Sequence, residues 1–212
     1  MATATKHCWG LKASMKYPSH LIKLIETLKK LPGVGSKSAE RFAFHLLEWE
    51  PGQLEEMGSI IASTPHKLCS CKTCGCLEDA GMCIFCTPKR TLHGTLCIIS
   101  SPKDAFAIDA TGEFQGCFHV LGSLLSPMSG KGADKIDVHK LIQRIEIHRI
   151  TEIVIALDST LEGDATALYL KSALANTNAT ISRLAFGLPM GSALEYVDGG
   201  TLAKAFSGRS PY

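Results

Sequence analysis

The feature of this sequence that most constrains its fold is a cysteine-rich stretch between Cys71 and Cys86. It holds two C-x-x-C pairs, Cys71 with Cys74 and Cys83 with Cys86, and eight residues separate the pairs. A C-x-x-C turn can direct both sulfur atoms at one point, so two such turns on a short loop can supply the four thiolates of a tetrahedral zinc site. The sequence therefore predicts one structural zinc ion per chain, bound by these four cysteines.

Other possible ligands lie close by in the sequence. Cys69 and Cys76 flank the first pair, and His66 and His93 lie near it. We favour the two C-x-x-C pairs, because the sulfur atoms of a C-x-C pair such as Cys69 with Cys71 converge on one metal less easily. The alternatives are buried or unpaired cysteines and, less favoured, disulfides. Four cysteine ligands would leave no coordination position for water, which argues against a catalytic zinc.

The composition indicates a globular protein. The chain has 212 residues, of which 45% are hydrophobic, enough for one medium domain or two small ones. It has no run of about 18 apolar residues, so no membrane span is expected. Nine cysteines without a secretory signal favour a reducing compartment, which we take to be the cytoplasm. Residues 1–14 are polar, and we expect them to be a disordered extension.

Two helices separated by a glycine turn are predicted ahead of the cysteines. Apolar residues recur at helical spacing up to Leu31, where Pro32 ends the first helix. Gly33-Val34-Gly35 follows as a tight turn, and the second helix begins near Ser36. Residues 16–45 also carry six basic and only two acidic side chains, although the net charge of the whole chain is only +2.

The turn and the second helix suit a nucleic-acid backbone. Two glycines let backbone N–H groups face outward at a helix N-terminus, where a phosphate can bind, and Lys37 and Arg41 are four residues apart, hence on one face. This pattern is similar to a helix-hairpin-helix DNA-binding motif. The candidate nucleic-acid contacts are Gly33, Gly35, Lys37, Arg41 and Lys29. The alternative is that the glycines only close a turn and the lysines are solvated.

The segment G-V-G-S-K-S is not expected to bind ATP as a P-loop. The two glycines of G-x-x-x-x-G-K-[ST] would have to stand at positions 31 and 36, which are Leu31 and Ser36. A P-loop also follows a buried strand, whereas a helix precedes this turn.

An α/β region follows the cysteines. Short apolar runs predict strands at 95–99, 117–121, 152–157 and 180–185. Helical patterns lie between them, and a further helix is expected over 53–63. This alternation implies a mostly parallel sheet, and the carboxyl ends of its strands carry Ser100 and Asp158.

This region resembles a Toprim domain, whose chemistry needs a carboxylate after the first strand and a D-x-D after a later one, both holding magnesium. Here the first position is Ser100, and the D-x-D position reads Asp158-Ser159-Thr160. Glu162-Gly163-Asp164 follows. Two of three metal ligands are therefore missing, which predicts a Toprim scaffold without the reaction. The alternative role for these acids is helix capping.

The order of these parts, from about Met15 to Arg209, resembles the RecR family of bacterial recombination mediators. Segments that carry the resemblance include L-P-G-V-G-S-K-S-A-E-R, T-G-E-F-Q-G-C-F-H-V-L-G and the tail R-L-A-F-G-L-P-M-G-S-A-L-E-Y-V-D-G-G-T-L-A-K-A-F. The resemblance implies binding to single-stranded or gapped DNA, action with RecF and RecO to help load RecA, a nucleoid-associated cytoplasmic location, and a dimer or ring tetramer. Ser100, Asp109 and Asp164 depart from the usual family residues.

We therefore expect an α/β protein with an extension (1–14), a helix-hairpin-helix region (15–66), a four-cysteine zinc finger (67–92), a Toprim domain (93–185) and a tail (186–212). The expected function is a non-catalytic DNA-binding adaptor or clamp. The alternatives are a metal-dependent Toprim nuclease or topoisomerase-like enzyme, and an RNA-binding zinc module. The apolar tail residues could form core or a subunit interface.

Overall fold

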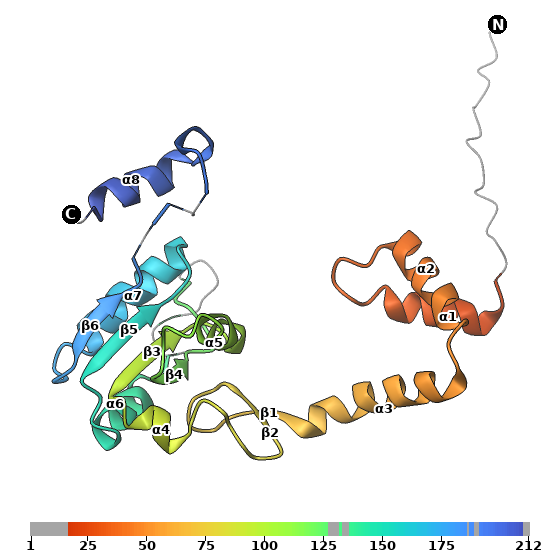
Figure 1. Ribbon diagram of the computed structural model, residues 1–212, viewed down its shortest axis with the longest axis horizontal. Coiled ribbons are helices and arrows are strands. Elements are labelled where there is room, and N and C mark those ends of the chain that lie inside the picture. Colours follow the sequence, from red (N-terminus) through yellow and green to blue (C-terminus); the bar gives the residue numbers. More distant parts are fainter. Residues whose placement is uncertain (1–16, 127–131, 133–135, 186, 189–190, 210–212) are drawn as a thin grey trace, which may run out of the picture. The chain divides into compact units, whose positions relative to one another are not determined.

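A computed structural model describes residues 17–126, 132, 136–185, 187–188 and 191–209 (Figure 1). The chain divides into two compact units, residues 1–64 and 65–212. The expected extension, residues 1–14, lies outside the described residues. Within the described ranges, no helix has the length and apolarity needed to cross a bilayer.

The first unit contains the predicted pair of helices. α1 (Ser19–Leu28) and α2 (Ser36–Leu46) pack against each other and are joined by the glycine turn (Figure 1). Ala39 and Ala43 are fully buried on α2, and Leu21 is buried on α1. Small side chains four residues apart on one helix face let a neighbouring helix approach closely, so this alanine pair makes room for α1.

α3 (Pro51–Lys67) follows, and its last three residues, from Pro65 on, belong to the second unit. It is longer than the helix expected over 53–63, because it continues through Pro65 in its last turn. A proline there removes one backbone hydrogen bond near the helix end. No residue of α3 is buried.

The cysteine-rich stretch opens with a small hairpin that sequence patterns did not predict. β1 (Leu68–Ser70) pairs antiparallel with β2 (Leu77–Asp79). A short helix, α4 (Pro88–Thr91), ends the stretch. Strands of three residues and a helix of four are too short to show a hydrophobic period.

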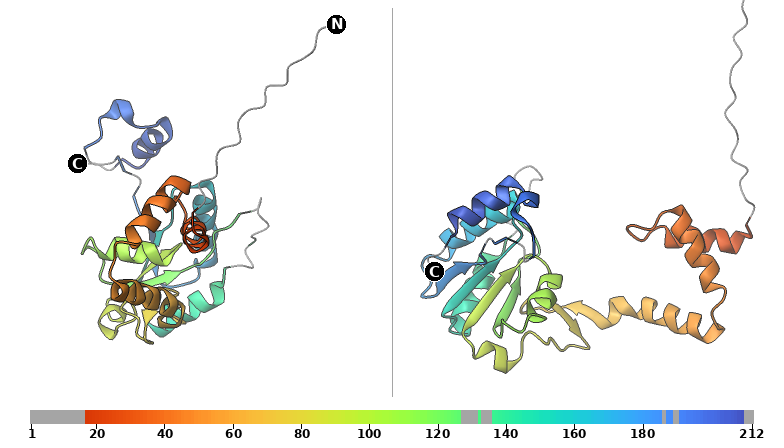
Figure 2. Two further views of the ribbon diagram at one scale, coloured as in Figure 1. Left: turned by 90° about the vertical axis from the view of Figure 1, so that its right-hand side faces the viewer. Right: turned by 45° about the horizontal axis from the view of Figure 1, so that its top comes forward.

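The main sheet has four parallel strands in the order β4-β3-β5-β6. They are β3 (Thr95–Ile99), β4 (Cys117–Val120), β5 (Glu152–Ala156) and β6 (Thr180–Arg183). The predicted mixed α/β class and parallel sheet are therefore confirmed. β3 and β5 lie in the middle, so β4 and β6 are the edge strands (Figure 2).

Alternate residues of the strands face two different layers. Leu96, Ile98, Ile153 and Ile155 pack with α6 (Val138–Ile147) and α7 (Leu161–Ala173) on one face. On the other face, Cys97 and Ile99 pack with α5 (Pro102–Asp109) and with the cysteine-rich stretch. The cysteine-rich stretch therefore forms part of the core of this unit.

The tail contains the 3-10 helix η3 (Leu194–Tyr196) and the helix α8 (Gly199–Ser207). The sequence analysis identified apolar residues in this segment but predicted no helix there. Asp198 caps α8 by accepting from the backbone N–H of Thr201. The Lys204 ammonium of α8 contacts Asp164 at 3.2 Å and Ser159 at 2.9 Å, both beside the start of α7. This polar contact joins the tail to the sheet domain.

Gly163 in the first turn of α7 gives a test of the packing. A Cβ atom at this buried position would lie 2.0 Å from the carbonyl oxygen of Asp158, so the turn after β5 would have to move. We expect Gly163→Ala to lower the free energy of unfolding by about 1–3 kcal/mol, measured by urea denaturation. Gly199→Ala in α8, where no atom lies within 4 Å of the added Cβ, is the control. Equal stability of the two variants would contradict this packing.

Candidate metal centre and nucleic-acid interface

The structure brings together the four cysteines of the two C-x-x-C pairs. The sulfur atoms of Cys71, Cys74, Cys83 and Cys86 all lie within 4.8 Å of one another. Two of the separations are 3.8 Å, between Cys71 and Cys86, and 3.5 Å, between Cys74 and Cys83. Four sulfurs at about 2.3 Å from one zinc ion are about 3.8 Å apart at tetrahedral angles, whereas a disulfide would need about 2.05 Å. The arrangement therefore fits a tetrathiolate metal site.

The backbone around Cys71 and Cys74 adopts a tight turn that directs both sulfur atoms toward the same point. The N–H of Gly75 donates to the carbonyl of Cys71 at 2.8 Å, and the N–H of Cys76 points at the sulfur of Cys74 at 3.4 Å. Gly75 has a positive φ of 77°, a conformation that a side chain would strain. An N–H group directed at a sulfur stabilises the thiolate form that a metal needs.

The acid–base properties of these thiols agree with a shared site. A hydrogen bond with the thiol of Cys76 is the main cause that lowers the pKa of Cys74, and the backbone N–H of Cys76 acts in the same direction. Burial raises the pKa of Cys83 to about 11. A thiolate in such surroundings is costly unless a cation neutralises it. A metal ion held by the four cysteines would supply such a cation.

The neighbouring candidate ligands lie outside the group. Cys69 is exposed on β1, and Cys76 is buried but is not one of the four grouped sulfurs. His66 and His93 are exposed. Among the described residues, the four cysteines are the one group of three or more histidine, cysteine or carboxylate side chains that could hold a metal ion.

Aromatic packing fixes the cysteine-rich stretch to the sheet. Phe85, between the last two cysteines, is fully buried and makes edge contacts with Phe106 of α5 and Phe118 of β4, each with ring centroids 5.1 Å apart. Arg90 of α4 lies over the Phe85 ring and pairs with Asp109 of α5. The sequence analysis did not identify Phe85 as a core residue. Its position between Cys83 and Cys86 could have indicated that an aromatic side chain packs beside the metal site.

The glycine turn between α1 and α2 has an open surface. Gly33 has a positive φ of 79° and so needs to be glycine for its conformation. Gly35 has an ordinary φ of −79°, yet among the described residues no heavy atom beyond its chain neighbours lies within 4 Å of where its Cβ would be. Neither conformation nor internal packing explains the glycine at position 35. The missing side chain leaves room for an external group to approach the backbone.

The N-terminus of α2 suits an anion. Its N-cap is Gly35, and no side chain caps the first turn, so backbone N–H groups there remain available for a phosphate. Lys37 and Arg41 are exposed on this helix, and no ion pair joins either of them to an acid in the described part of the chain. Lys29, the remaining candidate, differs because its ammonium pairs with Glu26 at 2.9 Å.

The carboxyl ends of β3 and β5 line a crevice of about 380 Å³. It contains all four residues of the degenerate Toprim site, Ser100, Asp158, Thr160 and Glu162. The Ser100 hydroxyl donates to Asp104 at 2.9 Å. Thr160 caps α7 by accepting from the N–H of Gly163 at 3.1 Å. Two of the positions at which the sequence analysis expects Toprim metal ligands are thus occupied by hydroxyl side chains that make local hydrogen bonds.

Asp164, the acid that ends the E-G-D segment, is held by cations of the chain itself. Arg183 of β6 and Lys204 of α8 both contact its carboxylate. Hydrogen bonds from Arg183 and Lys204, in that order, lower the pKa of Asp164. A carboxylate neutralised in this way attracts a magnesium ion weakly.

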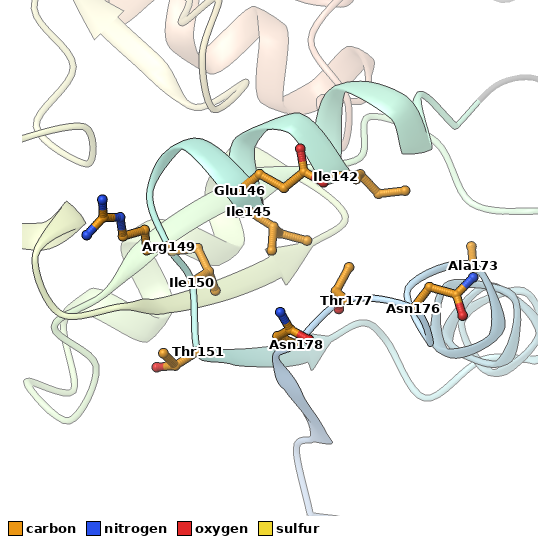
Figure 3. Close-up of a pocket in the computed structure, with 10 residues that line it drawn as sticks. All are labelled: Ile142, Ile145, Glu146, Arg149, Ile150, Thr151, Ala173, Asn176, Thr177 and Asn178. Carbon is orange, nitrogen blue, oxygen red and sulfur yellow. The ribbon is translucent and has the colours of Figure 1, made fainter.

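A larger cavity, of about 570 Å³, lies at the opposite end of β5 (Figure 3). Its lining is mostly isoleucine and neutral polar side chains, with Glu146 as the one carboxylate and Arg149 as the one cation among the described lining residues. It contains no nucleophile beside a base and no group of carboxylates, so it offers no evident catalytic constellation.

Models of three protein domains match this chain. The model described as "RecR, helix-hairpin-helix" matches residues 21–63, the Toprim domain model matches residues 94–185, and "RecR, C-terminal" matches residues 187–210. Full-length relatives are also similar, and three that are named "Recombination protein RecR" come from Protochlamydia amoebophila, Chlamydia abortus and Chlamydia trachomatis.

The first of these relatives is 53% identical over 198 residues, covering 93% of this chain and 100% of the relative. The second is 50% identical over 200 residues, with 93% and 100% coverage. The third is 48% identical over 198 residues, with 92% and 98% coverage. Identity at this level over nearly the whole length, together with the three domain matches, shows that the chain belongs to the RecR family of recombination proteins.

Proposed function

We propose that this protein is a non-catalytic DNA-binding adaptor or clamp in recombinational repair, which acts with RecF and RecO to help load RecA at single-stranded gaps. Family membership supports the role in recombination. The observation that carries the DNA contact is the uncapped N-terminus of α2, with an unobstructed Gly35 and the exposed side chains of Lys37 and Arg41. The proposed place of action is the bacterial nucleoid.

The proposed contact reads the sugar-phosphate backbone. Backbone N–H groups and two cations can bind phosphate groups, but these contacts do not distinguish one base from another. One hairpin neutralises few phosphates, so its binding is weak and decreases with salt. Several copies acting together would increase the affinity by avidity. We therefore propose that a dimer or ring tetramer is the DNA-binding form.

We also propose that the four cysteines hold zinc with a structural role. The sulfur spacing supports a tetrahedral ion with no position left for water. The three matched ranges support the helix-hairpin-helix region, the Toprim domain and the tail of the proposed division, whereas the proposed zinc finger (67–92) is supported by the sulfur spacing. The RNA-binding alternative would be favoured if single-stranded RNA displaced the protein from gapped DNA.

The DNA contact is tested by the double variant Lys37→Ala, Arg41→Ala. Removing two phosphate-binding cations should lower affinity for gapped DNA by at least tenfold in a gel-shift titration at low salt and make binding less salt-dependent. The fold and the metal content should not change. Lys171→Ala, which removes an exposed lysine from α7, is the matched control. Unchanged DNA binding by the double variant would contradict the proposal.

The metal assignment is tested by elemental analysis of protein purified under reducing conditions. We expect one zinc ion per chain, and Cys74→Ser should reduce the metal content and the thermal stability because the site lies in the sheet core. Cys69→Ser, which changes an exposed cysteine outside the group, should retain the metal. Wild-type protein without stoichiometric metal would remove the zinc assignment.

The absence of catalysis is tested with supercoiled plasmid and magnesium. Because Ser100 and Thr160 replace two metal ligands, we expect neither nicking nor relaxation by the purified protein. Nuclease activity that co-purifies with the wild type and disappears in Asp158→Asn would instead support the Toprim enzyme.

A further inference from the structure

The second half of α2 carries phenylalanine side chains that the first unit does not bury. Phe44 is 44% exposed and Phe42 is 39% exposed. Among the described residues of the first unit, the buried side chains are those of Leu21, Ala39 and Ala43. The two phenylalanines are therefore not part of this core. Large rings that remain exposed on a short helix are candidates for contact with an external group.

Phe44 lies on the face of α2 that carries the two proposed phosphate-binding cations. Arg41 is three residues before Phe44, and Lys37 is seven residues before it. At 3.6 residues per turn, this spacing places all three along one side of the helix. The buried Ala39 and Ala43 lie on the opposite side. A strand held by the two cations would therefore pass beside the Phe44 ring.

Contacts within the chain fix the position of this ring. The centroids of the Tyr17 and Phe44 rings lie 5.6 Å apart, and the ring planes are inclined by 71°. The Tyr17 hydroxyl in turn donates to the carboxylate of Glu40, one turn before Phe44 on α2. An edge-to-face partner orients an aromatic ring without covering all of it. The exposed part of Phe44 is thus preorganised for a planar partner.

Arg41 is also oriented by an aromatic neighbour. Its guanidinium lies over the Phe42 ring, 5.6 Å from the centroid. Such a contact orients the cation and leaves its charge available to a phosphate. Farther along the chain, the exposed His45 makes a ring contact with Trp49, with centroids 6.4 Å apart. The surface of α2 is therefore cationic in its first half and aromatic in its second half.

This order of charges and rings suits a single strand of nucleic acid. In a duplex the bases are stacked inside, so a protein surface at the phosphates meets no free base face. In a single strand a base can stack on an aromatic side chain while neighbouring phosphates contact cations. A second copy of the chain is a less suitable occupant. In a two-fold contact centred on this face, Lys37 and Arg41 of each copy would meet the same cations of the other.

We infer that Phe44 is a base-stacking site for single-stranded DNA. Lys37 and Arg41 hold phosphates, and one unstacked base of the same strand lies on the Phe44 ring. The site favours a single strand over a duplex. It does so without sequence preference, because every base has an aromatic face. This inference rests on the proposed DNA contact at α2 and specifies the form of DNA that the contact takes.

The experiment uses Phe44→Leu, which removes the ring but keeps an apolar side chain. Fluorescence anisotropy of the full chain at low salt measures the affinity for a labelled oligothymidylate and for a duplex of the same length. We expect Phe44→Leu to weaken single-strand binding by about 5–100-fold and to leave duplex binding unchanged. Phe44→Trp should bind the single strand at least as tightly as the wild type. Phe106→Leu, which changes a phenylalanine of equal exposure on α5, is the control and should bind both DNAs as the wild type does.

An abasic oligonucleotide supplies an independent readout. The wild type should lose a similar factor in affinity when abasic sites replace the thymidines, whereas Phe44→Leu should lose little, because its stacking partner is already absent. Equal affinity of the wild type for the abasic and the normal strand would overturn the inference. Equal losses of single-strand and duplex binding in Phe44→Leu would also overturn it. If Phe44→Leu does not fold, the abasic comparison on the wild type decides alone.

The double variant Lys37→Ala, Arg41→Ala separates this inference from the proposed function. Unchanged DNA binding by that variant would refute the DNA contact at α2 itself. Weaker binding by that variant, together with wild-type single-strand affinity in Phe44→Leu, would overturn the stacking site and leave the phosphate contact in place. A changed solution mass of Phe44→Leu with no abasic effect in the wild type would likewise overturn the inference and would indicate that Phe44 contacts a second copy.

Discussion

The structure of the second unit depends on how the outer edge of β4 is covered. An edge strand of a parallel sheet presents unpaired N–H and C=O groups, which are costly when buried and invite unwanted pairing when exposed. Here the carbonyl of Cys74 pairs with Val120, and Arg144 pairs with Phe118. The cysteine-rich turn therefore completes the sheet, and its shape depends on four sulfur atoms meeting at one point.

The two proposed functional surfaces differ in how their side chains are used. At the turn before α2, the chain places no side chain over Gly35, and the backbone and two exposed cations do the binding. At the ends of β3 and β5, side chains are present but make bonds within the protein: Ser100 to Asp104, and Thr160 to the first turn of α7. The first surface is open to a ligand, whereas the hydroxyl groups of the second are used in hydrogen bonds within the protein.

The elements with a clear periodic pattern were predictable from the sequence. β3 has the predicted bounds, and the other strands of the sheet end one or two residues earlier than expected. The β1–β2 hairpin and α4 were missed because segments of three or four residues carry no measurable period. α8 was missed because its start, Gly199-Gly200, indicates a loop until the Asp198 cap is seen. The meeting of the four sulfurs followed from local spacing alone, whereas Arg144 reaches Phe118 and His119 of β4 only through tertiary packing, which no local pattern records.

The ion pairs of Asp164 have a consequence for how the sequence of this protein can change during evolution. Arg183 and Lys204 come from β6 and from the tail helix, so the carboxylate now anchors the end of the chain. Restoring acids at positions 100 and 160 would leave this anchor in place, and freeing Asp164 for an ion would detach α8. Making Asp164 available to a metal ion would thus require coordinated changes at residues 19 and 40 positions away in the sequence. If the protein is non-catalytic as proposed, these ion pairs would help to maintain that state, in addition to the replaced residues at positions 100 and 160.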